Sequence, residues 1–303
     1  MKKLTVAAAA ALGAAALFAG GSGIFIMKNA AGGRRQTLDE AWKWQTEHYD
    51  LSWYDGIEKE EYTVSGYDEY VLHALLLKSP GSAGRYMILS HGYTDNRFGS
   101  LKYAKIYLDL GFSCILYDLR GHGENAPAPC TYGVLESKDL LAMVEDTRTR
   151  YGSDVIIGLH GESLGAATTV TALGEKPDVS FAVADCGFAD IENVLKGAAS
   201  QAHLPPQIVD LASGFSKLNG TFSYRDMQPV LHLKGNHIPV LFIHGASDTF
   251  IRPENSQRMY EATEGYRELH LIPGAGHAES VLKDPEEYAE AVRRFVEKVT
   301  ALT

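Results

Sequence analysis

Short apolar runs alternate with longer amphipathic stretches along most of this chain. The runs are almost continuously apolar, which is typical of strands whose two faces are both buried. Strands that alternate with helices in this way predict an α/β fold, with a mainly parallel sheet covered by helices on both sides. The expected strands are 85–90, 112–117, 154–160, 179–185, 238–244 and 267–272, and the expected helices are 101–110, 135–151, 166–173, 256–263 and 285–302.

The chain ahead of residue 85 has a different rhythm. Residues 60–64 and the largely apolar residues 70–77 are separated by a turn at 65–68, so they predict an antiparallel pair. Residues 38–54 carry Trp42, Trp44 and Trp53 among other aromatic and apolar residues. We expect an amphipathic helix that packs on the body of the protein rather than a binding element.

One segment breaks the alternation of strands and helices. Residues 187–236 contain no clear strand, and Pro205 and Pro206 separate two apolar stretches of helical character. A single helix would be enough to connect two parallel strands, so the extra length calls for another explanation. We predict a small helical cap of about 187–236 over the strand ends.

Residues 1–33 resemble a targeting segment, which leaves 34–303 as the folded domain. Lys2 and Lys3 precede an uncharged stretch from Leu4 to Met27, which is long enough to cross a bilayer. A cleaved signal peptide and an uncleaved membrane anchor both fit, and renewed apolarity before Met27 favours the anchor. The expected location is membrane-anchored or secreted, with the cytoplasmic face of the membrane as the alternative, since the flanking charges do not fix the orientation.

Composition narrows the class of partner. A net charge of −10 over 303 residues, without a basic patch, argues against nucleic acid. Three cysteines without metal-ligand spacing predict neither a metal site nor a full disulfide framework, although a single bridge stays open. Cys114 and Cys186 lie in apolar runs and are expected to be buried thiols.

The candidate chemistry centres on Gly161-Glu162-Ser163-Leu164-Gly165. A strand-like run precedes this stretch and a small-residue helical run follows, so the serine should lie at a sharp strand-to-helix turn. Such a turn holds the serine in a strained conformation. Glycine is needed two residues before and after it, because any side chain there would collide with a neighbouring element.

A serine nucleophile needs a base, and the base needs a third group to orient it. Asp248 follows the strand predicted at 238–244, and His277 follows the strand predicted at 267–272. The three residues therefore come in the order Ser163, Asp248, His277, each just past a strand end, where open parallel sheets place their sites.

Other polar residues at these strand ends are weaker candidates. Asp185 is an alternative acid, and Asp248 is preferred because its loop motif is complete. Structural roles are expected for His122 in a glycine-rich loop, His160 within a strand, Glu162 bonding locally away from the site, and Asp118 with Arg120 in a turn.

Stabilising an oxyanion requires two backbone N–H donors. Leu164 follows the nucleophile at a helix N-terminus and supplies one candidate. The loop after the first parallel strand, His91 to Asn96, supplies the other. Gly92 permits a sharp turn there, and the Tyr93 N–H is the expected second donor.

These motifs together resemble those of the α/β-hydrolase superfamily. The matching pieces occur in the family's order and cover about residues 60–300. The resemblance is greatest to bacterial membrane-associated or secreted hydrolases related to serine aminopeptidases and feruloyl-type esterases, and it implies an eight-stranded sheet with a cap after the sixth strand. The pieces are His91-Gly92, Asp118 to Gly123, Gly161 to Gly165, His244 to Asp248, and Gly274 to His277.

The expected activity is hydrolysis of a small-molecule carboxylic ester through an acyl-enzyme on Ser163, with no metal or cofactor. A serine peptidase or amidase with the same three residues is the alternative. No acidic cluster for holding a peptide amine is evident in the sequence, which favours esters. A catalytically inactive binding scaffold is a third hypothesis, disfavoured because such proteins usually lack one of the three residues.

Overall fold

The computed structural model describes residues 34–81, 84–201, 203–218 and 222–301. The chain divides into two compact units. One comprises Arg34–Asp190 with Gln228–Thr303, and the described residues of the other are 191–201, 203–218 and 222–227. Residues 1–33, with the predicted signal or anchor, lie outside the described residues. Across the described ranges, no helix has both the length and the apolar character needed to cross a membrane.

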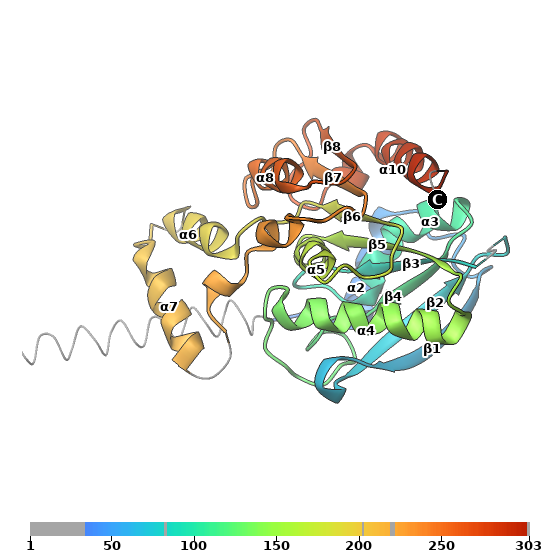
Figure 1. The fold of residues 1–303 in the computed structure, drawn as a ribbon, viewed down its shortest axis with the longest axis horizontal. Coiled ribbons are helices and arrows are strands. Elements are labelled where there is room, and N and C mark those ends of the chain that lie inside the picture. Colours follow the sequence, from blue (N-terminus) through green and yellow to red (C-terminus); the bar gives the residue numbers. More distant parts are fainter. Residues whose placement is uncertain (1–33, 82–83, 202, 219–221, 302–303) are drawn as a thin grey trace, which may run out of the picture. The chain divides into compact units, whose positions relative to one another are not determined.

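The larger unit is built on an eight-stranded sheet with the order β1-β2-β4-β3-β5-β6-β7-β8 (Figure 1). β1 pairs antiparallel with β2, and β2 pairs antiparallel with β4, while every other pair is parallel. The predicted sheet and its antiparallel beginning are therefore confirmed. The strands are β1 (Glu58–Ser65), β2 (Val71–Lys78), β3 (Arg85–Ser90), β4 (Ser113–Tyr117), β5 (Ile156–Glu162), β6 (Phe181–Asp185), β7 (Val240–Gly245) and β8 (Arg267–Ile272).

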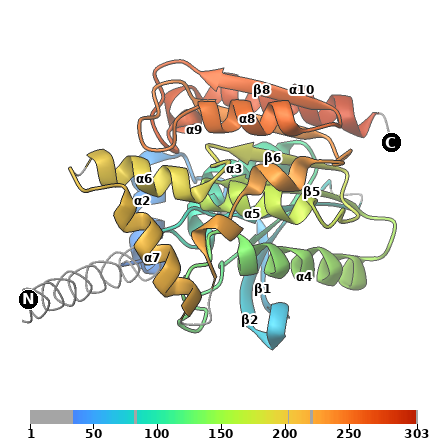
Figure 2. The ribbon, with the colours of Figure 1, turned by 60° about the vertical axis from the view of Figure 1, so that its left-hand side comes forward.

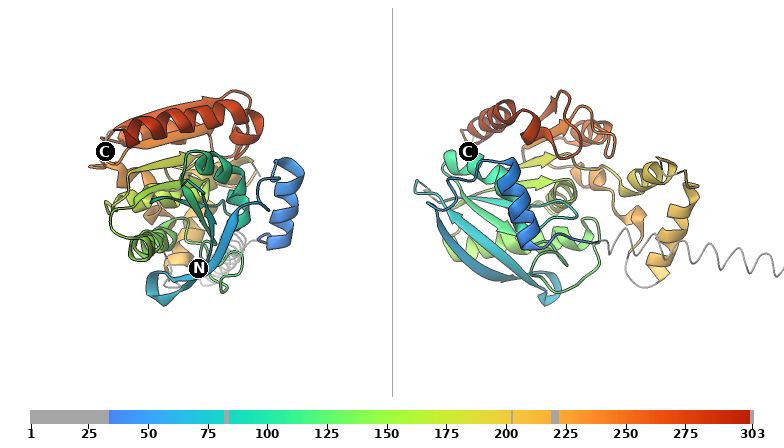
Figure 3. Two further views of the ribbon diagram at one scale, coloured as in Figure 1. Left: turned by 90° about the vertical axis from the view of Figure 1, so that its right-hand side faces the viewer. Right: turned by 180° about the vertical axis from the view of Figure 1, so that it is seen from behind.

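Helices cover both faces of this sheet. Figure 1 looks onto α4, α5 and α8, and the reverse view in Figure 3 shows α2, α3 and α10 on the other side. Figure 2 shows α4 and α5 lying next to each other, in agreement with their contacts. The helices of this unit are α2 (Leu38–His48), α3 (Leu101–Asp109), α4 (Val134–Tyr151), α5 (Leu164–Leu173), α8 (Glu254–Ala262), α9 (Ser280–Lys283) and α10 (Pro285–Thr300), with short 3₁₀ turns at Tyr67–Glu69, Arg97–Ser100 and Pro229–Leu233.

The last helix shows how the apolar pattern produces the core. Asp284 caps α10 by accepting a hydrogen bond from the Glu287 N–H at 3.1 Å, and Pro285 occupies the first turn. Burying each large apolar side chain of the helix stabilises the fold by about 1.5–3 kcal/mol. The buried positions recur every three or four residues: Tyr288, Ala291, Val292, Phe295, Val296 and Val299.

The aromatic N-terminal helix is shorter than predicted. A capping box at Thr37 and Glu40 starts α2 as expected of its sequence, but the helix ends at His48 rather than at Tyr54. The Asp50 side chain accepts a hydrogen bond from the Ser52 N–H at 2.9 Å, and this local turn competes with further helix. Trp53 lies beyond the helix yet still packs against the core.

The three cysteines are buried free thiols, so the bridge that the sequence left open does not form. Cys114 and Cys186 are fully buried, as expected from their apolar surroundings.

The terminal strand β1 carries charge along much of its length. Glu58, Lys59, Glu60 and Glu61 are all exposed. Lys78 on β2 forms ion pairs with Glu58 at 2.8 Å and with Glu60 at 3.2 Å.

The smaller unit contains α6 (Ile191–Gln201), α7 (Gln207–Leu218) and a 3₁₀ turn at Tyr224–Asp226. Lys196 on α6 forms ion pairs with Glu192 at 2.6 Å and with Asp210 on α7 at 2.9 Å. Its described residues include no strand, as the sequence predicted. That it serves as a cap stays a prediction.

Candidate active site

The candidate residues follow the carboxyl ends of three parallel strands. Ser163 comes directly after β5, Asp248 lies in the loop after β7, and His277 lies in the loop after β8. Parallel strands bring their carboxyl ends to one edge of the sheet, where clefts and sites form. Residues more than a hundred positions apart in the chain thereby reach one place.

Ser163 has a strained backbone at the predicted turn. Its φ of 53° and ψ of −109° lie in a backbone region that residues with a side chain rarely adopt. Such a conformation costs about 1–3 kcal/mol of stability. A Cβ on Gly161 would lie 2.1 Å from the Gly165 carbonyl oxygen, and a Cβ on Gly165 would lie 2.0 Å from that of Ser90. The Ser163 N–H donates to the Asp185 carbonyl at 2.8 Å. Both glycines are therefore required by close approach of backbone, as the sequence indicated.

The structure brings Ser163, His277 and Asp248 into one hydrogen-bonded chain. The Ser163 Oγ lies 3.0 Å from Nε2 of His277, and Nδ1 of His277 lies 2.7 Å from Oδ2 of Asp248. These distances are those of a nucleophile, a base and an acid in mutual contact. Ser163 is 8% exposed and the His277 side chain is 23% exposed, so the two residues lie at the edge of the buried interior.

Asp248 is held as a carboxylate. Its Oδ1 accepts the N–H groups of Phe250 at 2.8 Å and Ile251 at 2.9 Å. Burial opposes ionisation, but hydrogen bonds from His244 and His277 outweigh it and hold the pKa of Asp248 well below its usual range. An ionised aspartate can orient an imidazole and stabilise its protonated form.

Asp185, the alternative acid, bonds to two tyrosines and not to His277. Its Oδ2 accepts hydrogen bonds from the hydroxyls of Tyr103 and Tyr288, each at 3.1 Å. Burial raises its pKa to about 6, helped by the negative charge of Glu162. The acid that contacts His277 is therefore Asp248.

Glu162 does not bond locally. Its carboxylate forms a buried ion pair with Lys102 on α3 and accepts a hydrogen bond from the Tyr103 hydroxyl at 2.5 Å. Oε1 of Glu162 would lie 3.0 Å from a Cβ on Gly92. The side chain thus lies beneath the loop after β3, and the expectation of a local role was wrong because a partner distant in sequence neutralises its charge.

The loop after β3 is fixed by a histidine. Nε2 of His91 accepts the Leu119 N–H at 2.9 Å, so Nδ1 carries the proton and donates to the Gly92 carbonyl at 2.7 Å. In a trans peptide the Tyr93 N–H points opposite to that carbonyl. Leu164 is the first residue of α5, and its N–H has no partner within the helix. Leu164 is thus part of the turn at Ser163, and Tyr93 belongs to the loop after β3. The role of their N–H groups as oxyanion donors stays a prediction.

Comparison with known proteins identifies the family to which this fold belongs. A model of the alpha/beta hydrolase family matches residues 87–291. The chain belongs to the alpha/beta hydrolase family. YqkD of Bacillus subtilis, an uncharacterised protein, is 30% identical over 82% of this chain and 83% of its own.

Solved structures of hydrolases share the fold of this family member. Esterase Pf2001 of Pyrococcus furiosus has a TM-score of 0.68 at 24% identity, over 82% of this chain and 95% of that chain. XC6422 of Xanthomonas campestris, described as a serine hydrolase without lid, has a TM-score of 0.54 at 20% identity, over 78% of this chain and 94% of that chain. The superfamily predicted from the sequence is confirmed, and a hydrolase is supported.

In this alpha/beta hydrolase, His122 has a structural position. Nε2 lies 2.5 Å from the Tyr93 carbonyl oxygen, and Nδ1 lies 2.9 Å from that of Arg120. Two carbonyl neighbours would favour a charged ring, but burial dominates and lowers the pKa of His122 to about 3. The ring is therefore neutral and donates to one of the two oxygens at a time. His91 and His122 thus hold the carbonyls of two consecutive residues of the loop.

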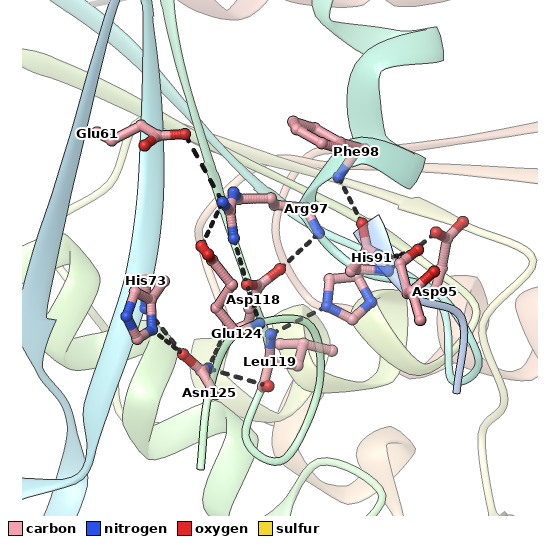
Figure 4. Close-up of polar contacts among 12 residues, drawn as sticks. Glu61, His73, His91, Asp95, Arg97, Phe98, Asp118, Leu119, Glu124 and Asn125 are labelled. Carbon is pink, nitrogen blue, oxygen red and sulfur yellow. Dashed lines mark hydrogen bonds and ion pairs between the residues drawn. The ribbon is translucent and has the colours of Figure 1, made fainter. Parts of the chain in front are cut away.

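The motif after β4 is organised by an arginine from another loop, as Figure 4 shows. Asp118 is fully buried and accepts from Arg97 twice, from its N–H at 2.8 Å and from its guanidinium at 2.6 Å. Asp118 and Arg120 do not pair with each other. Arg120 instead binds Asp139 on α4 through two nitrogens, at 2.7 and 3.0 Å. The predicted turn exists, but its two charges are each neutralised by a different element.

His160 is buried within β5, as expected. Its Nδ1 lies 2.8 Å from the Tyr107 hydroxyl, and its Nε2 has no hydrogen-bond partner in the described part of the chain. Burial, with a smaller contribution from Lys102, lowers the pKa of His160 to about 3. The imidazole is neutral at physiological pH and plays no part in the Ser163 chain.

Replacing His160 with leucine is expected to make the free energy of unfolding fall less steeply as the pH is lowered. The unfolded chain protonates this ring at a pKa of about 6.5. Between about pH 6.5 and pH 3, only the unfolded state binds this proton. The neutral ring therefore contributes its full stability above pH 6.5, and this contribution is lost as the pH falls towards 3. The slope of unfolding free energy against pH should decrease by about 1.4 kcal/mol per unit, measured by urea denaturation from pH 7 to pH 4.

Tyr107→Phe is the matched control for this slope. It removes the hydrogen bond to His160 but leaves the imidazole buried. We expect lower stability at every pH and an unchanged slope. Equal slopes in wild type and His160→Leu would contradict a depressed histidine pKa.

Sequence reasoning missed three charged or polar residues around this site. Lys102 follows Leu101 in an amphipathic helix, where a lysine normally faces solvent, so one sequence offers no signal for its burial. Arg97 is the buried partner of Asp118, again without a local cue. His244 belongs to a motif that the sequence did single out, but only the structure shows that it contacts Asp248.

Proposed function

We propose that this protein is a serine hydrolase that cleaves carboxylic esters through an acyl-enzyme intermediate. The observation that carries the proposal is the unbroken chain of contacts from Ser163 through His277 to Asp248. A serine hydroxyl becomes a useful nucleophile when a base in contact with it takes its proton.

In the first half-reaction, Ser163 Oγ attacks the ester carbonyl carbon while its proton moves to Nε2 of His277. Asp248 stabilises the imidazolium through Nδ1. The carbonyl oxygen becomes an oxyanion, and the N–H groups of Tyr93 and Leu164 are proposed to donate to it. The intermediate then collapses, and Nε2 returns the proton to the departing alcohol.

In the second half-reaction, His277 takes a proton from water, and the resulting hydroxide attacks the acyl group on Ser163. The oxyanion forms again at the same donors. Collapse breaks the bond to Oγ, and the proton on Nε2 returns to the serine, which releases the carboxylic acid. Each proton taken up by His277 is given back within the same half-reaction, so the cycle needs no cofactor.

Two considerations favour an ester over an amide. The sequence shows no acidic cluster for holding a peptide amine. Pf2001, which shares the fold over most of its length, is named an esterase. A peptidase or amidase would use the same three residues, so the choice between them needs a direct measurement.

Purified protein is expected to hydrolyse p-nitrophenyl butyrate, and a fluorophosphonate is expected to label Ser163, with the site identified by mass spectrometry of the digested protein. Both results follow from a nucleophilic serine that forms a covalent intermediate. If the protein hydrolysed no ester across a series of acyl chain lengths and Ser163 were not labelled, the proposal would be contradicted.

A matched series of amino-acid p-nitroanilides separates esters from amides, because the leaving group carries the same aromatic ring. We expect kcat/KM to be higher for the esters after correction for their faster uncatalysed hydrolysis. A clear preference for the anilides would replace the esterase with the peptidase alternative.

A further inference from the structure

Asp248 is contacted by a second histidine, His244, at the end of β7. Nε2 of His244 lies 3.2 Å from Oδ2 of Asp248, the same oxygen that Nδ1 of His277 approaches to 2.7 Å. His244 is fully buried. One carboxylate oxygen therefore serves two imidazoles, one facing Ser163 and the other facing the interior.

The neighbours of His244 fix its tautomer. Nε2 also lies 2.6 Å from the Ile251 carbonyl oxygen, so both of its close neighbours are acceptors and Nε2 carries the hydrogen. Nδ1 lies 2.7 Å from Oγ of Ser256 on α8. In the neutral ring Nδ1 accepts, and the Ser256 hydroxyl donates. Ser256 is fully buried as well.

We propose that His244 and Ser256 form a second arm on Asp248, which sets how strongly that carboxylate attracts a proton to His277. The contacts run Ser163–His277–Asp248–His244–Ser256. His244 is a positioning residue that acts through Asp248, and its effect on turnover rests on the proposed function.

The physical effect of this arm is electrostatic. The N–H of His244 is shared between the Ile251 carbonyl oxygen and Oδ2 of Asp248. Its contact with Oδ2 stabilises the charged carboxylate and reduces the negative charge that Oδ2 presents to the N–H of His277. Oδ1 of Asp248 is held separately by the N–H groups of Phe250 and Ile251. The aspartate therefore keeps two anchors when His244 is replaced, and the main change is a stronger hold on the His277 imidazolium. Losing His244 should raise the pKa of His277.

Other ionisable groups interact with His244 and Asp248, and their titration must be separated from that of His277. Asp185, at the end of the neighbouring strand β6, interacts electrostatically with His244, and its pKa is raised to about 6 by burial. Burial raises the thiol pKa of Cys186 well above the usual value, and the negative charge of Asp248 adds to this effect. Asp185→Asn in each background removes this carboxyl group, whose raised pKa lies in the pH range of the titration.

The test is an NMR titration of the His277 ring in the full-length protein with ¹⁵N-labelled histidine, with the His277 signals assigned by their loss in His277→Gln. His244→Phe, which removes the donor, is expected to raise the pKa of His277 by about 0.5–1 unit. His244→Gln, which keeps an N–H near the position of Nε2, should restore a value close to that of wild type. Ser256→Ala, which releases the tautomer, should give a smaller upward shift.

The acid limb of the pH profile of kcat/KM should move by the same amounts in the same directions. A structural role alone would lower activity or stability without moving either pKa. An unchanged His277 pKa in both His244→Phe and Ser256→Ala would overturn the proposal. If His244→Phe does not fold, an unchanged value in Ser256→Ala overturns it alone.

The NMR titration does not require turnover, so the two proposals fail in different ways. Absence of both ester cleavage and Ser163 labelling in wild type would overturn the proposed function. A shift of the His277 pKa in the variants would still support the second arm.

Discussion

Replacing Ser163 with alanine is expected to lower kcat for ester hydrolysis by about 10⁴-fold or more. The proposed mechanism routes both half-reactions through Oγ, and no other hydroxyl contacts Nε2 of His277 in the described part of the chain. The measurement is steady-state hydrolysis of p-nitrophenyl butyrate with purified variant and wild type. Fluorophosphonate labelling should disappear together with turnover.

The variant should remain folded, because alanine and serine both carry a Cβ at the strained φ of 53°. Thr168→Ala offers a matched control. It also removes a buried hydroxyl from α5, and that oxygen has no hydrogen-bond partner among the described residues. Thr168→Ala is expected to keep nearly full activity. Substantial turnover in Ser163→Ala would mean that another residue or a directly activated water attacks the ester.

Replacing Arg97 with methionine is expected to lower the free energy of unfolding by about 3–5 kcal/mol. Arg97 is 3% exposed and Asp118 is fully buried, so methionine would leave a carboxylate in the interior without its cation. Two backbone N–H groups, from Arg97 and Glu124, would still reach Asp118 but carry no full charge. Denaturation in urea at pH 7 measures the loss.

Two comparisons make this result specific. Arg293→Met breaks an exposed pair with Glu290 and is expected to cost at most about 1 kcal/mol. Arg97→Met combined with Asp118→Asn removes both charges, and the double variant should be less destabilised than the sum of the two single variants. A loss below about 1 kcal/mol in Arg97→Met would show that solvent or the two remaining backbone N–H donors compensate the buried carboxylate.

The parts of the fold that could be predicted are those with a local cause. β3 begins and ends at the predicted residues, because a continuous apolar run bounded by polar residues is a strand signal in itself. The strand-to-helix turn at Ser163 was also predictable from a local cause. Its glycines are required by close contacts with backbone a few residues away or on the adjoining strand. The candidate triad came from three such local motifs and the order in which they occur.

The parts that could not be predicted depend on which distant charge reaches a buried one. Asp118 and Arg120 are neighbours in sequence, yet each pairs with a residue from a separate element. Glu162 is paired by Lys102, a residue whose position in an amphipathic helix suggests solvent exposure. Burial makes these pairings obligatory, but sequence spacing does not indicate which partner fulfils them.

The charged strand β1 also has a consequence for self-association. As the terminal strand of the sheet, it offers one row of backbone groups to any strand that approaches from another molecule. Such a strand would lie beside Glu58, Lys59, Glu60 and Glu61, and it would disturb the ion pairs of Glu58 and Glu60 with Lys78. Desolvating these charges opposes the hydrogen bonds that strand addition would gain. The charges along this edge therefore disfavour the addition of a strand from another molecule.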